Sequence, residues 1–203
     1  MFKQVFDDNG YIIIPKLIPI EFCYFFTHTL LRQQYIEKVK GDSQVPKAKA
    51  ILNHELMFET LQEILWPEIE SIIDDELLPT YSYARLYSNG DDLEPHTDRP
   101  ACEISATIQL GRSHHYAWPI YIGNTRIDLG EGDAIIYKGC EVEHHRKICE
   151  GPANYYSGQV FIHFVKKNGE FSNHFKDIIE FDNKEERNKV DFTKNRTSLM
   201  EIK

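Results

Sequence analysis

The sequence predicts a mainly β domain with flanking helices, built as a sandwich or a jelly-roll barrel. Two observations indicate this architecture. Up to about residue 78, apolar side chains recur at helical spacing. From about residue 79 to residue 165, the chain instead shows short runs of period two, separated by Gly, Pro, Asn and Asp. About seven or eight strands at this spacing are typical of a sandwich or a jelly roll.

The composition is that of one globular domain. With 203 residues, 41% of them hydrophobic, the chain can bury one substantial core. We expect a single domain over residues 1–165, with a helical part at about 1–78 and a β core at about 79–165. Residues 166–203 are expected to form a polar extension, because "DNKEERNKVDFTKNRT" lacks the apolar side chains of a core.

Charge and apolar runs argue against two classes of partner. The formal net charge of −9 disfavours nucleic-acid binding, which needs a broad basic face. We expect no membrane partner, because no apolar run has the length of a transmembrane helix and "MFKQVFDDNG" is not a signal peptide. The 4 cysteines are widely spaced without a C-x-x-C pair, so we expect reduced thiols in a cytoplasmic protein.

The N-terminal part is predicted to contain one strand followed by helices. "NGYIIIPKLIPIEF" contains a turn, a β-branched strand and the start of a helix near Pro19, and this helix is predicted to run from Ile20 to about Val39. "VKGDSQVPKAK" predicts a loop. "ILNHELMFETLQEILWPEIESIIDDELL" then predicts one or two helices, with a kink or a fresh start at Pro67.

The strands of the β part follow from turn residues and alternation. "IYIGNTRI" predicts a hairpin with Gly123-Asn124 as its two-residue turn, and "DAIIY" and "YYSGQVFIHFV" predict further strands.

Two stretches in this part, "YSYARLY" and "EISATIQL", place polar and apolar side chains on opposite faces. The polar faces could point to water. Alternatively, they line a barrel interior while the apolar faces pack under the helices. Alternation does not separate these two interpretations.

A metal site is the chemical hypothesis that the histidines suggest. "EPHTDRPACEISATIQL" places His96 and Asp98 two residues apart, so that both can face one ion on extended backbone. "YKGCEVEHHRKI" adds His144 and His145 on another predicted strand. Two histidines and one carboxylate with open positions opposite are the pattern of a non-haem Fe(II) centre, whereas structural zinc needs four ligands. A turn with local hydrogen bonds is the alternative interpretation of the H-x-D motif alone. Convergent ligands favour the interior location of the polar faces.

The sequence resembles the Fe(II)/2-oxoglutarate-dependent oxygenase superfamily, and especially its prolyl-4-hydroxylase-like and phytanoyl-CoA-hydroxylase-like members. The resemblance is carried, in this order, by "GYIIIP", "LLPTYSYARLYSNGDDLEPHTDRPACEISATIQL", "WPIYI" and "GEGDAIIYKGCEVEHHR". It implies a double-stranded β-helix (jelly roll) with helices packed on one face. It also implies Fe(II) as cofactor, 2-oxoglutarate as co-substrate and O2 as oxidant.

The resemblance implies specific roles for several residues. His96, Asp98 and His144 match the metal-binding motif, with His144 favoured over His145 by the alignment. Tyr87 lies where related hydroxylases place a tyrosine that contacts 2-oxoglutarate. Asp98 argues against a halogenase, in which that carboxylate is absent.

One family feature is missing. The last barrel strand usually carries a basic residue for the distal carboxylate of 2-oxoglutarate, but "ANYYSGQVF" has none and offers the neutral Gln159. A buried carboxylate needs a cation. Arg146 is our first choice, because it shares a strand face with His144, and Arg85 is the second. A surface salt bridge with Glu143 or Glu150 is the alternative role for Arg146. Arg99 is expected to support Asp98 or to contact substrate.

These expectations define the predicted function as hydroxylation of a small-molecule or peptide substrate, with decarboxylation of 2-oxoglutarate to succinate. The alternative is an inactive cupin-like module that binds metal or 2-oxoglutarate without turnover. A nucleic-acid demethylase of the same superfamily fits the acidic charge poorly.

Overall fold

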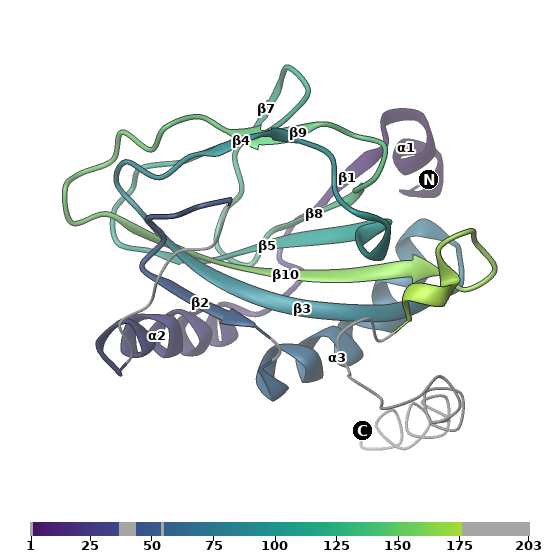
Figure 1. Ribbon diagram of the computed structural model, residues 1–203, viewed down its shortest axis with the longest axis horizontal. Helices are drawn as coiled ribbons and strands as arrows, with labels where there is room; N and C mark the ends of the chain where they lie inside the picture. The colour runs from purple at the N-terminus through teal and green to yellow at the C-terminus, as the bar shows by residue number, and fades with distance from the viewer. Residues whose placement is uncertain (1, 37–43, 54, 176–203) are drawn as a thin grey trace.

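The computed structural model describes residues 2–36, 44–53 and 55–175, which form two facing antiparallel sheets (Figure 1). The larger sheet has six strands in the order β1-β8-β5-β10-β3-β2, and the smaller has four in the order β4-β9-β6-β7. The fold is therefore a mainly β jelly roll with flanking helices, as predicted. The strands are β1 (Tyr11–Ile14), β2 (Ala50–Asn53), β3 (Leu77–Ser88), β4 (Leu93–His96), β5 (Ile104–Arg112), β6 (Ile120–Ile122), β7 (Thr125–Ile127), β8 (Ala134–Lys138), β9 (His144–Arg146) and β10 (Tyr156–Lys166).

The helices cover one side of the larger sheet. Figure 1 shows α2 and α3 along its outer face, with the smaller sheet on the opposite side. The helices are α1 (Phe2–Asn9), α2 (Ile20–Ile36) and α3 (Leu56–Ile73), and the short 3-10 turns are η1 (Pro100–Cys102) and η2 (Ser172–His174). None of the helices in the described ranges is long and apolar enough to cross a membrane.

The main hydrophobic core lies between the helices and the larger sheet. The apolar faces of β3 and β5, including Ala84, Leu86, Ile104 and Ile108, pack there against side chains of α2 and α3. The opposite faces of these strands point between the two sheets and carry buried polar groups. These groups are Arg85, Tyr87, Ser105, Thr107 and Gln109. The interior location of the polar faces is therefore confirmed.

Most predicted elements are present. α2 begins at Ile20, directly after Pro19. The predicted hairpin is formed by β6 and β7, and Gly123 has φ +53° at its turn. The strands predicted from "DAIIY" and "YYSGQVFIHFV" are β8 and β10. α3 is a single helix that continues through Pro67.

Three N-terminal features differ from the expectation. Residues 51–53 were expected to be helical but belong to β2, which pairs with β3 in the register Ala50↔Leu86. β2 and the first two residues of β3, Leu77 and Leu78, therefore make the part before residue 79 less helical than predicted. Helix α1 has no counterpart among the predicted elements. The predicted end of the first helix near Val39, part of the loop after it and most of the polar extension lie outside the described residues.

Candidate metal and co-substrate site

The pairing of β4 with β9 brings the candidate metal ligands together. His96 at the end of β4 lies opposite His144 on β9. Asp98 follows β4, and its backbone N–H donates to the carbonyl of Gly139, 2.8 Å away. Segments far apart in the sequence thus meet at one end of the smaller sheet.

The three side chains converge through defined atoms. His144 Nε2 lies 3.5 Å and His96 Nε2 3.8 Å from Asp98 Oδ1. The Nδ1 atoms face backbone carbonyls, at 3.1 Å from Val142 O for His144 and 2.8 Å from Glu94 O for His96. Because a carbonyl only accepts, each Nδ1 carries the proton and each Nε2 is left as a lone-pair donor.

This arrangement fits a divalent cation. Two unprotonated imidazole nitrogens and one carboxylate oxygen face a common point, and a cation there would satisfy all three. The carbonyls behind the rings fix their tautomers, as outer partners do in metal sites. Gln44 Nε2 also lies 3.4 Å from His96 Nε2, at the mouth of the site.

Asp98 is held as an ionised carboxylate although it is largely buried. Burial by itself raises the pKa of Asp98. The close contact with His144, the electrostatic interaction with His163 and the hydrogen bond from Ser105 outweigh burial and lower the pKa below its usual value. Ser105 Oγ donates to Asp98 Oδ2 at 2.9 Å, so Oδ1 is the oxygen that faces the histidines.

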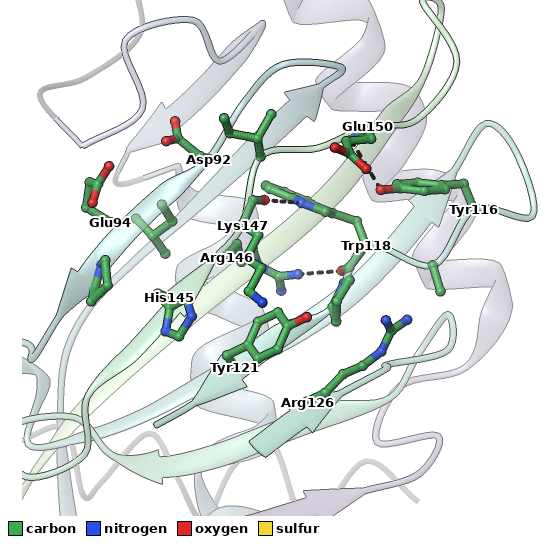
Figure 2. Close-up of a pocket in the computed structure, with 15 residues that line it drawn as sticks. Asp92, Glu94, Tyr116, Trp118, Tyr121, Arg126, His145, Arg146, Lys147 and Glu150 are labelled. Carbon is green, nitrogen blue, oxygen red and sulfur yellow. Dashed lines mark hydrogen bonds between the residues drawn. The ribbon is translucent and has the colours of Figure 1, made fainter. Parts of the chain in front are cut away.

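An open cleft of about 390 Å³ adjoins the ligands. Its volume is in the range of small-ligand pockets. It is lined by Gln44, Asn53, Tyr81, Tyr83, Arg85, His96, Thr97, Asp98, Arg99, Cys102 and His163. A larger groove of about 640 Å³ lies over the outer face of the smaller sheet, and its lining includes Arg146 but none of the three ligands (Figure 2). Ligand chemistry rather than volume therefore identifies the candidate site.

Several solved structures share this architecture. A prolyl-4-hydroxylase from Pseudomonas putida shares 14% identity with a TM-score of 0.61, over 82% of this chain and 99% of that one. The 2-oxoglutarate-dependent epimerase SnoN of nogalamycin biosynthesis gives 12% identity and a TM-score of 0.65, over 81% of each chain. HygX from Streptomyces hygroscopicus, solved with nickel and 2-oxoglutarate bound, shares 13% identity with a TM-score of 0.61, over 81% of this chain and 86% of that one.

The chain has the fold of the Fe(II)/2-oxoglutarate-dependent oxygenases. No family model matches the sequence, and no curated protein matches it. The likeness therefore lies in the structure, at low sequence identity.

Within this oxygenase fold, Arg146 lies deep between the sheets. It shares the inner face of β9 with His144 and is 3% exposed. Its Nη1 donates to Trp118 O at 2.7 Å (Figure 2) and its Nη2 to Gln159 Oε1 at 3.1 Å. Both acceptors are neutral, and no carboxylate among the described residues pairs with it. The surface salt bridge considered for Arg146 is therefore wrong.

Arg85 and Tyr87 occupy the adjacent interior wall on β3. Arg85 Nη1 donates to the hydroxyl of Tyr87 at 2.9 Å, and the guanidinium lies 5.3 Å from the ring centre of Tyr83. Gln159 lies on β10 and couples Arg146 to Gln109, whose Oε1 is 3.3 Å from Gln159 Nε2. The four candidate co-substrate residues thus lie in one interior, but Arg146 and Arg85 reach it from opposite sheets.

Arg99 lies at the mouth of the cleft. Its guanidinium is 4.7 Å from the ring centre of Tyr81. This location brings it close to the space beyond the ligands, where a primary substrate would enter.

Four residues of the site were not predicted from the sequence: Ser105, Trp118, Gly139 and His163. Ser105 belongs to the polar face of β5, and His163 has the same parity as Gln159 on β10, so alternation could have indicated both. Burial lowers the pKa of His163 to about 4, the nearby Asp98 opposing this shift. No comparable pattern indicated Trp118 or Gly139.

Proposed function

We propose that this protein is a non-haem Fe(II)/2-oxoglutarate-dependent oxygenase that hydroxylates a small-molecule or peptide substrate. One observation carries the proposal: a single interior contains both a convergent His-Asp-His group and a buried cation without a described anionic partner. The fold comparison supports the same assignment at the level of architecture.

The metal half of the site is formed by His96, Asp98 and His144. Their Nε2 and Oδ1 atoms would hold Fe(II) on one side and leave the cleft side open. When bound, iron with 2-oxoglutarate and O2 supplies oxidative decarboxylation to succinate and CO2, with the second oxygen atom entering a substrate C–H bond.

The co-substrate half depends on Arg146. Burying a guanidinium without a counter-ion is costly, so a bound anion would stabilise it. One two-residue step along a strand, about 6.6–6.8 Å, separates Arg146 from His144. That span suits a diacid with one carboxylate at the metal and the other at Arg146. Tyr87 could contribute a hydroxyl to the same carboxylate.

The cleft beside the ligands would receive the primary substrate. Tyr81, Tyr83 and Arg99 line it, and they offer ring faces and polar contacts to a small molecule or a peptide segment. The formal net charge of −9 continues to disfavour a nucleic-acid substrate.

The direct test is turnover of the co-substrate in the absence of primary substrate. Purified protein with Fe(II), 2-oxoglutarate and ascorbate should release succinate slowly, as oxygenases do in uncoupled turnover. Asp98→Ala should abolish this release, because it removes the anionic ligand from a site with three protein ligands. Equal succinate release by a folded Asp98→Ala protein would eliminate the mechanism.

A binding module without turnover is the second candidate. It is favoured by the neutral Gln159 on the last strand, where the resemblance implies a basic residue. Saturable 2-oxoglutarate binding by calorimetry, together with no succinate at any enzyme concentration, would support this module instead.

A further inference from the structure

His163 lies at an irregular point of β10. The pairing of β10 with β3 shifts register between Ile162 and Phe164. Gln62 of α3 is buried there, and its Nε2 donates to the carbonyls of His163 at 2.6 Å and Tyr81 at 3.1 Å. Bulges free backbone groups and redirect side chains near active sites. The side chain of Gln62 satisfies these carbonyls and thereby fixes the backbone that carries His163.

The His163 ring is held inside the cleft wall. It is 2% exposed, and its centre lies 4.6 Å from the ring of Tyr81 and 5.7 Å from that of Tyr83. Its Nδ1 lies 2.9 Å from Ser105 Oγ. Its Nε2 has no hydrogen-bond partner in the described part of the chain.

Ser105 connects this ring to Asp98. Its Oγ lies 2.9 Å from Asp98 Oδ2 and 2.9 Å from His163 Nδ1. The hydroxyl has a single proton, and an ionised carboxylate is the stronger acceptor for it. Ser105 therefore donates to Asp98, and His163 must donate its Nδ1 proton to Ser105.

We infer that His163 and Ser105 form a hydrogen-bonded relay that positions the Asp98 carboxylate for metal binding. The relay engages Oδ2, so that Oδ1 is presented to His96 and His144. His163 is thus a positioning residue that acts through Ser105. This inference rests on the proposed metal site and adds a determinant of its affinity.

The contacts favour this relay over a second metal ion. Asp98, Cys102 and His163 also have their potential ligand atoms close together. However, Ser105 Oγ already bridges Asp98 and His163, and Cys102 Sγ lies 3.0 Å from the hydroxyl of Tyr81. Hydrogen bonds therefore already engage Asp98 Oδ2, His163 Nδ1 and Cys102 Sγ.

A double-mutant cycle on Co²⁺ affinity tests the relay. Outer partners of metal ligands typically contribute a factor of about 10–100 to affinity. Ser105→Ala and His163→Phe should each weaken Co²⁺ binding by at least ~10-fold. The double variant should bind Co²⁺ no more weakly than Ser105→Ala, because both changes break the same chain of hydrogen bonds. His163→Asn should restore affinity to within ~3-fold of wild type, since its amide N–H can replace the Nδ1 donor.

Ser82→Ala is the matched control. Ser82 is a buried serine on the same sheet, its Oγ has no partner in the described ranges, and Co²⁺ affinity should not change. Wild-type affinity in His163→Phe, or additive losses in the double variant, would overturn the relay.

A second measurement does not depend on metal. Long-range ¹H–¹⁵N NMR spectra of the metal-free protein should show His163 protonated at Nδ1, and protonation at Nε2 would overturn the relay whatever the metal result. Wild-type protein that binds no Co²⁺ at all would instead overturn the proposed function, and the relay with it.

Discussion

His144 and His145 are neighbours in the sequence, but they lie on opposite faces of β9. His144 is 3% exposed and points to Asp98, whereas the ring of His145 stacks on Tyr121 at 5.0 Å on the outer face (Figure 2). The alternation of a strand makes this separation obligatory, so only one of the two can reach the candidate metal position.

The two histidines should therefore differ in their effect on metal binding. His144→Ala should lower Co²⁺ affinity by at least ~100-fold, beyond the range of outer-partner effects, because it removes a ligand. His145→Ala is the matched control and should leave affinity within ~3-fold of wild type. Calorimetry on both variants measures this, and a larger loss in His145→Ala would refute the assignment of His144.

Replacing Arg146 should separate co-substrate binding from metal binding. Arg146→Met should raise the apparent KM for 2-oxoglutarate by at least ~10-fold, through loss of a charge-assisted pair worth roughly 1.5–3 kcal/mol, with Co²⁺ affinity unchanged. In thermal unfolding, 2-oxoglutarate should raise the Tm of the wild type but not of this variant.

Two arginine variants serve as comparisons for Arg146→Met. Arg126 is exposed on β7 and bonded to Asp128, so Arg126→Met should behave as wild type. Arg85→Met tests the second candidate. An increase in KM confined to Arg85→Met would move the carboxylate contact to β3.

Acidification should destabilise the metal-free protein through His163. The folded-state pKa of His163 is about 4, against an ordinary value of 6.5. Between pH 4 and pH 6.5, the His163 side chain is therefore protonated in the unfolded chain but neutral in the folded protein. The stabilising contribution is present above pH 6.5 and is lost as the pH falls from there toward 4. Between pH 7 and pH 4.5, the wild type should lose about 2–3 kcal/mol more unfolding free energy than His163→Asn. Urea titrations at both pH values measure the difference, and equal losses in the two proteins would contradict it.

Gly139 should tolerate no side chain, because the Asp98 loop packs directly against it. A Cβ at this position would lie 2.6 Å from Asp98 Oδ2 and would overlap the carbonyl of Cys102. Gly139→Ala should cost roughly 1–3 kcal/mol of stability, as overpacking does, and should also weaken Co²⁺ binding. Gly158→Ala on β10 is the control, since its Cβ would make contacts no shorter than 3.4 Å. Wild-type Tm and Co²⁺ affinity in Gly139→Ala would show that the loop can move away.

The strands of the jelly roll could be predicted because their signals are local. The Gly123-Asn124 turn and the alternation of β5 depend only on residues a few positions apart. β2 could not be predicted in this way. Residues 51–53 are continuous with the apolar pattern of α3, and they are extended because they pair with β3, some thirty residues further along the chain.

The candidate site was predictable as a set of residue types but not as an arrangement. The H-x-D motif and the parity of His144 and Arg146 are visible in the sequence. The role of Ser105 and His163 could not be predicted from the sequence, because their hydrogen bonds join β5, β10 and the loop that carries Asp98.

The sequence by itself determined which side chains share a face of each strand, because a strand alternates with period two whatever surrounds it. Only the tertiary structure decided which of those faces is the interior. That choice depends on the helices covering one side of the larger sheet and on the smaller sheet closing over the other. Arg146 became a buried cation and His145 an outer-face residue through that closure, which no local pattern encodes.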